Sequence, residues 1–163
     1  MNLIDAPVVF ALRTARAGLA EGGLTRWAQA AARESLFLSA LSLHELEQQA
    51  ARAEQQDSGA GRRWRQWLDE HVLRAFNGRV LPVDAAVARR AAALDYADPR
   101  DALIAATALE HAMTLVTFRA AAFRAGRVKT FDPTGYEPSA TTEDWREAAR
   151  ATPVWIKSLF VRS

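Results

Sequence analysis

The chain has 163 residues and a formal net charge of +2; half of its residues are hydrophobic and a quarter are charged. These values are typical of one globular domain with a hydrophobic core, and they exclude an intrinsically disordered chain. Without cysteine there can be no disulfide framework, thiolate nucleophile or cysteine-based zinc site, and no apolar run approaches the roughly 18 residues of a membrane helix. We therefore expect a cytoplasmic protein with no membrane partner.

Short apolar strands alternate with helices along the chain. Strands are predicted at residues 3–4, 36–38, 80–83, 114–117 and 128–131. Helices are predicted from Pro7 to Leu19, around Trp27, from Ser42 to about Gln56, from Trp64 to Val72, from Asp84 to Leu94 and from Ala102 to His111. Because the strands are apolar throughout, the pattern predicts an α/β domain whose mainly parallel sheet is covered by helices on both faces.

The alternation ends near residue 133, so we expect a domain at residues 1–133 and a C-terminal extension at residues 134–163. Thr141 to Asp144 is typical of a helix start, and Pro153 ends the predicted short helix. The apolar residues that follow, from Trp155 to Val161, are expected to pack on the domain or on a partner. If this apolar segment were the functional surface, the chain would be mainly an assembly partner.

Three carboxylates are candidates for a metal site. Asp5 follows the first strand, Glu45 lies one turn into the helix after the second strand, and Asp101 begins a helix. Ligands of an open parallel sheet bind beyond the carboxyl ends of its strands, and clustered carboxylates suit a hard cation such as Mg²⁺. Each acid also has a structural explanation, since Ser42 and Glu45 match a capping box and Asp5 and Asp101 are common at helix starts.

Four segments of the chain, in order, resemble motifs of one family. Their sequences are LIDAPVV at 3–9, LSALSLHEL at 38–46, GRVLPVD at 78–84 and DALIAATA at 101–108. Together they are similar to the PIN-domain ribonuclease toxins of the VapC and plasmid-stability type, over most of residues 1–133. The resemblance implies a three-layer α/β/α domain with a parallel sheet of four or five strands.

The resemblance also implies a function and a set of site residues. Such proteins are Mg²⁺- or Mn²⁺-dependent ribonucleases of toxin–antitoxin pairs, which form homodimers and are inhibited by a small antitoxin protein. Asp5, Glu45 and Asp101 take the positions of three of the four family acids. By resemblance they are the catalytic residues and the metal ligands, and RNA is the substrate.

The chain departs from the family pattern around these acids. Ala6 and Pro7 replace a hydroxyl and an amide after the first acid, Arg119 stands at the fourth acid or its amide substitute, and Ala122 removes a further acid. The segment before the fourth motif is also shorter than usual. If Arg119 points inward, the site has a formal charge of −2, against −4 for four acids. A single ion would then bind weakly, and Arg119 could hold a phosphate instead.

Two functions therefore remain open. The first is a metal-dependent RNA endonuclease, the toxin of a type II toxin–antitoxin module, with weakened activity and one weakly held Mg²⁺ or Mn²⁺ ion. The second is a catalytically inactive PIN-like protein without an ion, which binds an antitoxin, RNA or a second copy of itself. The three retained acids favour the first, whereas Arg119, Ala122 and the Ala6–Pro7 replacement favour the second.

Overall fold

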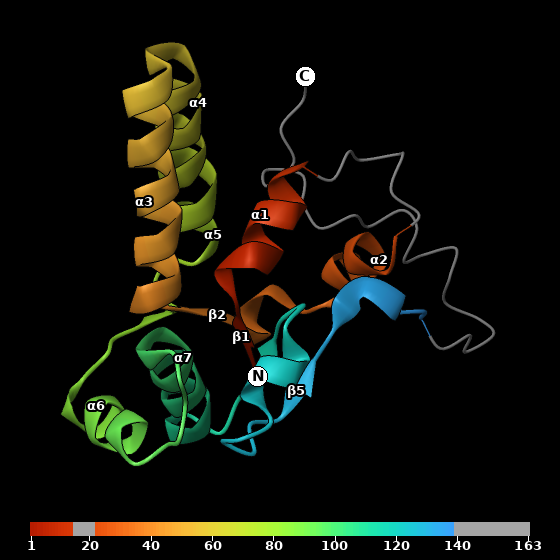
Figure 1. Ribbon diagram of the computed structural model, residues 1–163. Helices are drawn as coiled ribbons and strands as arrows, with labels where there is room; N and C mark the ends of the chain where they lie inside the picture. Colours follow the sequence, from red (N-terminus) through yellow and green to blue (C-terminus); the bar gives the residue numbers. More distant parts are fainter. Residues whose placement is uncertain (15–21, 139–163) are drawn as a thin grey trace.

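The computed structural model describes residues 1–14 and 22–138, which form an α/β domain around one sheet (Figure 1). The sheet has five strands in the order β3-β2-β1-β4-β5, and every pair of neighbours is parallel. The strands are β1 (Asn2–Ile4), β2 (Leu36–Ser39), β3 (Val80–Leu81), β4 (Thr114–Val116) and β5 (Thr130–Phe131). The predicted parallel sheet of four or five strands is confirmed.

The unbroken apolar runs of the strands are explained by burial on both faces of the sheet. Leu3 and Leu115 pack with Ile104 on one face, whereas Ile4 and Val116 pack on the other with Val8. All six side chains are almost completely buried. Successive residues of a strand point to opposite faces, so a strand covered on both sides has apolar residues at consecutive positions.

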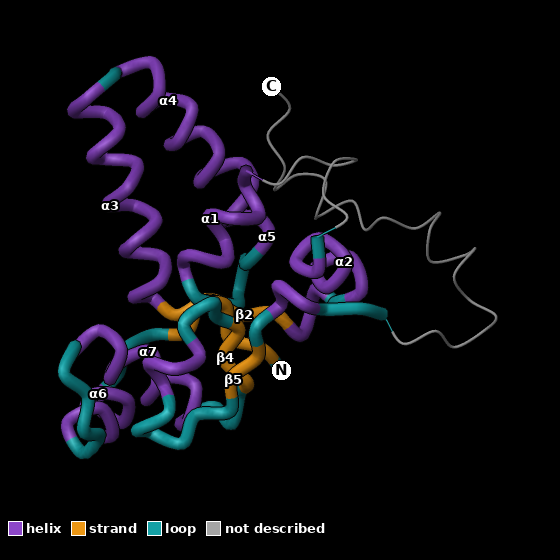
Figure 2. The backbone as a smooth tube through the Cα atoms, turned by 45° about the vertical axis from the view of Figure 1, so that its right-hand side comes forward, coloured by secondary structure: helices purple, strands orange, loops and turns teal. Residues whose placement is uncertain are grey.

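Helices cover the two faces of this sheet (Figure 2). On one side lie α1, α3, α4 and α5, while α6 packs on α7 at the other. The helices are α1 (Ala6–Thr14), α2 (Gly23–Ala30), α3 (Ala40–Gln56), α4 (Ser58–Trp67), α5 (Leu73–Ala75), α6 (Ala85–Ala92) and α7 (Pro99–Glu110), with a π-helical segment at Leu68–Val72 between α4 and α5. Short 3-10 turns occupy Arg33–Ser35, Ala120–Phe123 and Pro133–Gly135.

Helices α3 and α4 form an antiparallel hairpin that projects beyond the sheet (Figure 1). Asp57 ends α3 and caps α4 by accepting a hydrogen bond from the Gly59 amide at 2.7 Å. The two helices touch where Gly61 faces Glu54, since a Cβ atom on Gly61 would lie only 2.4 Å from the Glu54 Cα. A glycine at this position therefore allows the close approach of the hairpin.

Two helix starts differ from the sequence prediction. Helix α3 begins at Ala40, capped by the Ser39 side chain, which accepts a hydrogen bond from the Ser42 amide at 2.9 Å. The cap of α7 is Asp98. Ser42 and Asp101 are therefore not caps, and the capping-box interpretation of Glu45 is wrong. The reason is that Ser39 and Asp98 themselves have extended backbone, as a cap requires, whereas Ser42 and Asp101 already lie within the helices.

The strands β3, β4 and β5 are shorter than predicted, and Val83, Thr117 and Val128 lie outside them. The predicted helix and apolar terminus of the C-terminal extension fall within residues 139–163, outside the described residues. Within residues 1–14 and 22–138, the longest apolar helices are too short or too polar to cross a bilayer.

Candidate active site

Asp5 lies at the carboxyl end of the central strand β1, where the chain turns into α1. Its amide donates to the Val116 carbonyl of β4 at 3.0 Å, and its own carbonyl accepts from the Val8 amide at 3.0 Å. These bonds join Asp5 to both the sheet and the first turn of the helix. The residue is 1% exposed, so its carboxylate is fixed in the interior at the end of the sheet.

The Asp5 carboxylate is only partly satisfied by hydrogen bonds. Its Oδ2 atom accepts from the Thr117 hydroxyl at 2.7 Å, whereas its Oδ1 atom is buried without a hydrogen-bond partner among the described residues. Burial raises the pKa of Asp5 above its ordinary value, although the Thr117 hydrogen bond and the Arg119 charge act in the opposite direction. The site therefore holds a carboxylate whose ionised form is poorly solvated.

Arg119 binds the second acid, Asp101. Asp101 is buried in the first turn of α7, and Arg119 follows β4 in the loop that leads to residues 120–123. The Arg119 Nη2 and Nη1 atoms donate to Asp101 Oδ1 at 2.7 Å and Oδ2 at 3.1 Å. Nη2 also lies 3.8 Å from Asp5 Oδ2. The hydrogen bonds to Asp101 are the largest cause of the raised Arg119 pKa, and the guanidinium stays charged between the two acids.

The third acid, Glu45, pairs with a second arginine. Its side chain projects from the second turn of α3, is 14% exposed and accepts a hydrogen bond from the Arg100 guanidinium. Arg100 directly precedes Asp101 at the start of α7, so one helix turn supplies both an acid and a cation. We call this cluster the acid centre, and it consists of the acids Asp5, Glu45 and Asp101 and the arginines Arg100 and Arg119. Its three carboxylates and two guanidinium groups give a formal charge of −1.

The acid centre does not fit a divalent ion as it is arranged. The carboxylate oxygens are of the kind that Mg²⁺ and Mn²⁺ prefer. However, the Arg119 guanidinium occupies the space between Asp5 and Asp101, and Glu45 is engaged by Arg100. In the part of the chain that the structure describes, no three acidic or histidine side chains form a group able to hold a metal ion.

The sequence did not indicate a site role for two residues, Arg100 of the acid centre and Thr117 beside it. Thr117 was expected only as a strand residue, yet its hydroxyl is the hydrogen-bond donor to Asp5, 112 positions away. Arg100 is the partner of Glu45 across 55 positions. The only sequence signal for Arg100 is its place beside Asp101. Among the replaced positions, Ala6 is buried against the core and brings no polar group, whereas Ala122 is exposed.

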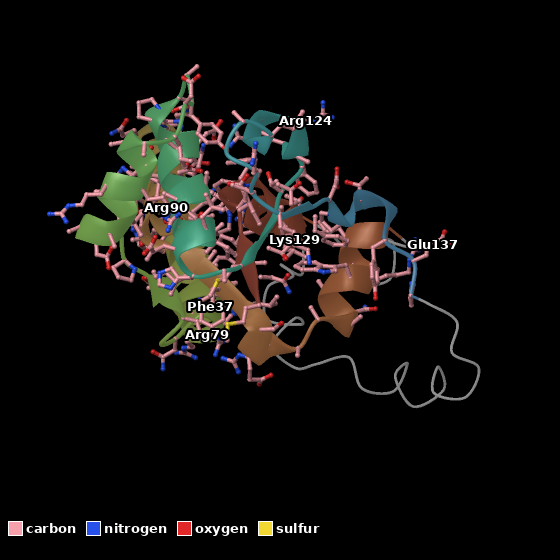
Figure 3. All side chains as sticks on the ribbon, turned by 90° about the horizontal axis from the view of Figure 1, so that it is seen from below. Phe37, Arg79, Arg90, Arg124, Lys129 and Glu137 are labelled. Atoms are coloured by element: carbon pink, nitrogen blue, oxygen red, sulfur yellow. The ribbon has the colours of Figure 1, made fainter. Side chains whose placement is uncertain are left out.

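A groove of about 430 Å³ lies at the opposite edge of the sheet, where the strands begin. Polar residues at or beside the strand starts line the groove, namely Asn2, Thr114, Lys129 and Thr130. The aromatic residues that line it are Trp27, Phe131 and Tyr136. Figure 3 shows the molecule from this side and labels Lys129. The described residues that line the groove include no carboxylate, and none of them belongs to the acid centre.

Comparison with known proteins decides the family. Residues 3–126 match the family model of the PIN domain. The chain belongs to the PIN-domain family. The resemblance stated from the four motifs is thereby confirmed, and the five-stranded α/β architecture agrees with a PIN fold.

Two solved structures extend this likeness over nearly the whole of their chains. A chain of FitAcB from Neisseria gonorrhoeae has 29% sequence identity and a TM-score of 0.71, and the match covers 82% of this chain and 98% of that one. A chain of FitAB bound to an IR36 DNA fragment has 27% sequence identity and a TM-score of 0.69, and the match covers 85% of this chain and 99% of that one. No curated protein matches the sequence significantly.

Proposed function

We propose that the chain is the PIN-domain subunit of a toxin–antitoxin pair, which binds a small antitoxin protein in the cytoplasm and holds RNA without rapid metal-dependent cleavage. The likeness to chains of FitAB, a toxin–antitoxin complex, supports the antitoxin partner. The observation that carries the proposal is the bidentate ion pair between Arg119 and Asp101, which places a guanidinium where the two central acids face each other.

The arginines of the acid centre give this PIN domain a way to hold RNA. The Arg119 and Arg100 side chains are 45% and 57% exposed, so each guanidinium presents donors to solvent while it pairs with an acid. A guanidinium carries five N–H donors in a planar fork that matches a phosphate. We expect the RNA backbone to bind across these two side chains at the carboxyl ends of the strands.

Co-expression of this chain with whichever small protein a neighbouring reading frame encodes tests the antitoxin partner. With a tag on the small protein alone, the two should co-purify, and light scattering should give the mass of a defined complex. The mass of the chain alone tests the predicted homodimer, and a chain ending at Gly135 tests whether residues 136–163 contribute to assembly. If no complex forms with a folded chain, the antitoxin proposal is wrong.

A second candidate function is the metal-dependent ribonuclease. Asp5, Glu45 and Asp101 lie at the same edge of the sheet, and the buried Asp5 Oδ1 atom lacks a hydrogen-bond partner in the described part of the chain, which favours an additional ligand there. These three acids would be the residues that hold the ion if Arg119 moved away. When bound, the ion would supply an activated water and charge stabilisation at the phosphate.

Cleavage of mixed tRNA and rRNA, with and without Mn²⁺, separates the two functions. The first proposal predicts no metal-dependent cleavage above background by folded protein, together with RNA retention that Arg119→Ala and Arg100→Ala both weaken. Cleavage that requires Mn²⁺ and disappears in both Asp5→Ala and Asp101→Asn would instead establish the ribonuclease.

A further inference from the structure

We infer that the Arg119 guanidinium replaces the divalent cation of the acid centre, so that a cation site forms between Asp5 and Asp101 only when Arg119 is removed. The inference rests on the proposed function, in which the Arg119–Asp101 ion pair keeps a divalent ion out of the acid centre. Its tests measure ion binding, whereas those of the proposed function measure antitoxin binding, RNA retention and cleavage, so the two can fail separately.

The contacts of Arg119 are those of a bridging cation. Nη2 donates to Asp101 Oδ1 at 2.7 Å and at the same time lies 3.8 Å from Asp5 Oδ2, while Nη1 donates to the other oxygen of Asp101. The guanidinium thus uses both oxygens of one acid and faces the second. A bidentate fork to a carboxylate is among the strongest hydrogen-bonded pairs in proteins.

The guanidinium and an ion exclude each other. Mg²⁺ and Ca²⁺ bind carboxylate oxygens at about 2.0–2.6 Å, which requires the same Asp101 and Asp5 atoms that Arg119 contacts. An ion at that distance would also place its two positive charges beside the positive charge of the Arg119 guanidinium. Binding of an ion therefore has to displace Arg119, and the free energy of the ion pair opposes it.

Arg119 is held in place by its backbone as well as by its charge. Its amide donates to the Thr117 hydroxyl oxygen at 3.1 Å, and the same hydroxyl donates to Asp5. Its guanidinium carbon lies 5.5 Å from the centre of the Phe123 ring, within the range of a cation–π contact. The backbone amide thus holds the residue, while Asp101 and the Phe123 ring hold its guanidinium against displacement.

Removing the guanidinium leaves two facing carboxylates without a cation. Asp5 is 1% exposed and its Oδ1 atom has no hydrogen-bond donor within residues 1–14 and 22–138, so water solvates this acid poorly. Like charges this close repel, and a divalent ion relieves the repulsion. Arg119→Ala should accordingly be less stable than the wild type without metal and regain stability when Mn²⁺ is added.

The experiment measures Mn²⁺ binding to the full chain by calorimetry and by thermal unfolding. Arg119→Ala should bind one ion, and its Tm should rise by roughly 5–10 °C when Mn²⁺ is about 100 times its Kd. The wild type should show no such rise. Arg100→Ala is the matched control, because it removes an equal charge from the acid centre but leaves the guanidinium between Asp5 and Asp101.

Two further variants locate the site and cover a failure to fold. Arg119→Ala combined with Asp101→Asn should lose the Mn²⁺ response, and Arg119→Gln replaces Arg119→Ala if the latter does not fold. The inference is overturned if the wild type binds Mn²⁺ as tightly as the Arg119 variant, if Arg100→Ala gains the same response, or if neither Arg119 variant binds the ion.

Discussion

Replacing Thr117 with valine tests whether its hydroxyl supports an ionised, buried Asp5. The change keeps the shape of the side chain and removes the hydrogen bond of 2.7 Å to Asp5 Oδ2, along with the acceptor for the Arg119 amide. A hydrogen bond to a charged group contributes about 1.5–3 kcal/mol. Since 1 kcal/mol shifts the Tm of a domain of this size by about 2–4 °C, we expect Thr117→Val to lower it by roughly 3–12 °C.

Thr107 supplies the matched control. It is fully buried like Thr117, but its hydroxyl donates to the Leu103 carbonyl within α7 at 2.8 Å, so both partners are neutral. A neutral hydrogen bond contributes about 0.5–1.5 kcal/mol. Thr107→Val should therefore cost less stability than Thr117→Val in chemical denaturation at pH 8.

Asp5→Asn completes a double-mutant cycle with Thr117→Val. Without the carboxylate charge the Thr117 hydrogen bond is a neutral one, and charge-assisted bonds are roughly twice as strong as neutral ones. The cost of Thr117→Val should thus fall to about half in the Asp5→Asn background. Equal costs for Thr117→Val and Thr107→Val, or an unchanged cost in that background, would refute the view that Thr117 stabilises an ionised Asp5.

Three more predictions concern pH, a surface ion pair and the helical hairpin. Burial raises the pKa of Asp5 in the folded state, so the folded chain binds the proton more tightly than the unfolded chain and loses stability as pH rises through that pKa. The Tm of Asp5→Asn minus the Tm of the wild type should therefore be larger at pH 8 than at pH 5. A Tm difference that does not change with pH would contradict this. Arg100→Ala should cost less than about 1 kcal/mol in urea unfolding, because its pair with Glu45 is largely exposed on the arginine side; a larger loss would show that the pair is part of the core. Gly61→Ala should lower the free energy of unfolding by about 1–3 kcal/mol in the same assay, because its Cβ would overlap the Glu54 backbone. A neutral effect would mean that helices α3 and α4 can move apart.

The sequence by itself determined the fold class and the family. Short apolar strands that alternate with helices are a local pattern, and the burial of Leu3 on one face and Ile4 on the other explains why that pattern predicts a covered parallel sheet. Asp5, Glu45 and Asp101 could be chosen as candidates because each lies shortly after a strand or at a helix start, which are positions that the sequence reveals.

Only the tertiary structure decided which partner each acid has. Arg119 is 18 positions from Asp101, and Glu45 is 55 positions from Arg100, so no local pattern indicates these pairs. The direction of the Arg119 side chain, which the sequence left open, depends on how the loop after β4 packs against α7. The arginines and acids at this edge of the sheet come from segments far apart in the sequence, and only folding brings them together. Their pairing decides whether the three acids face a metal ion or a guanidinium.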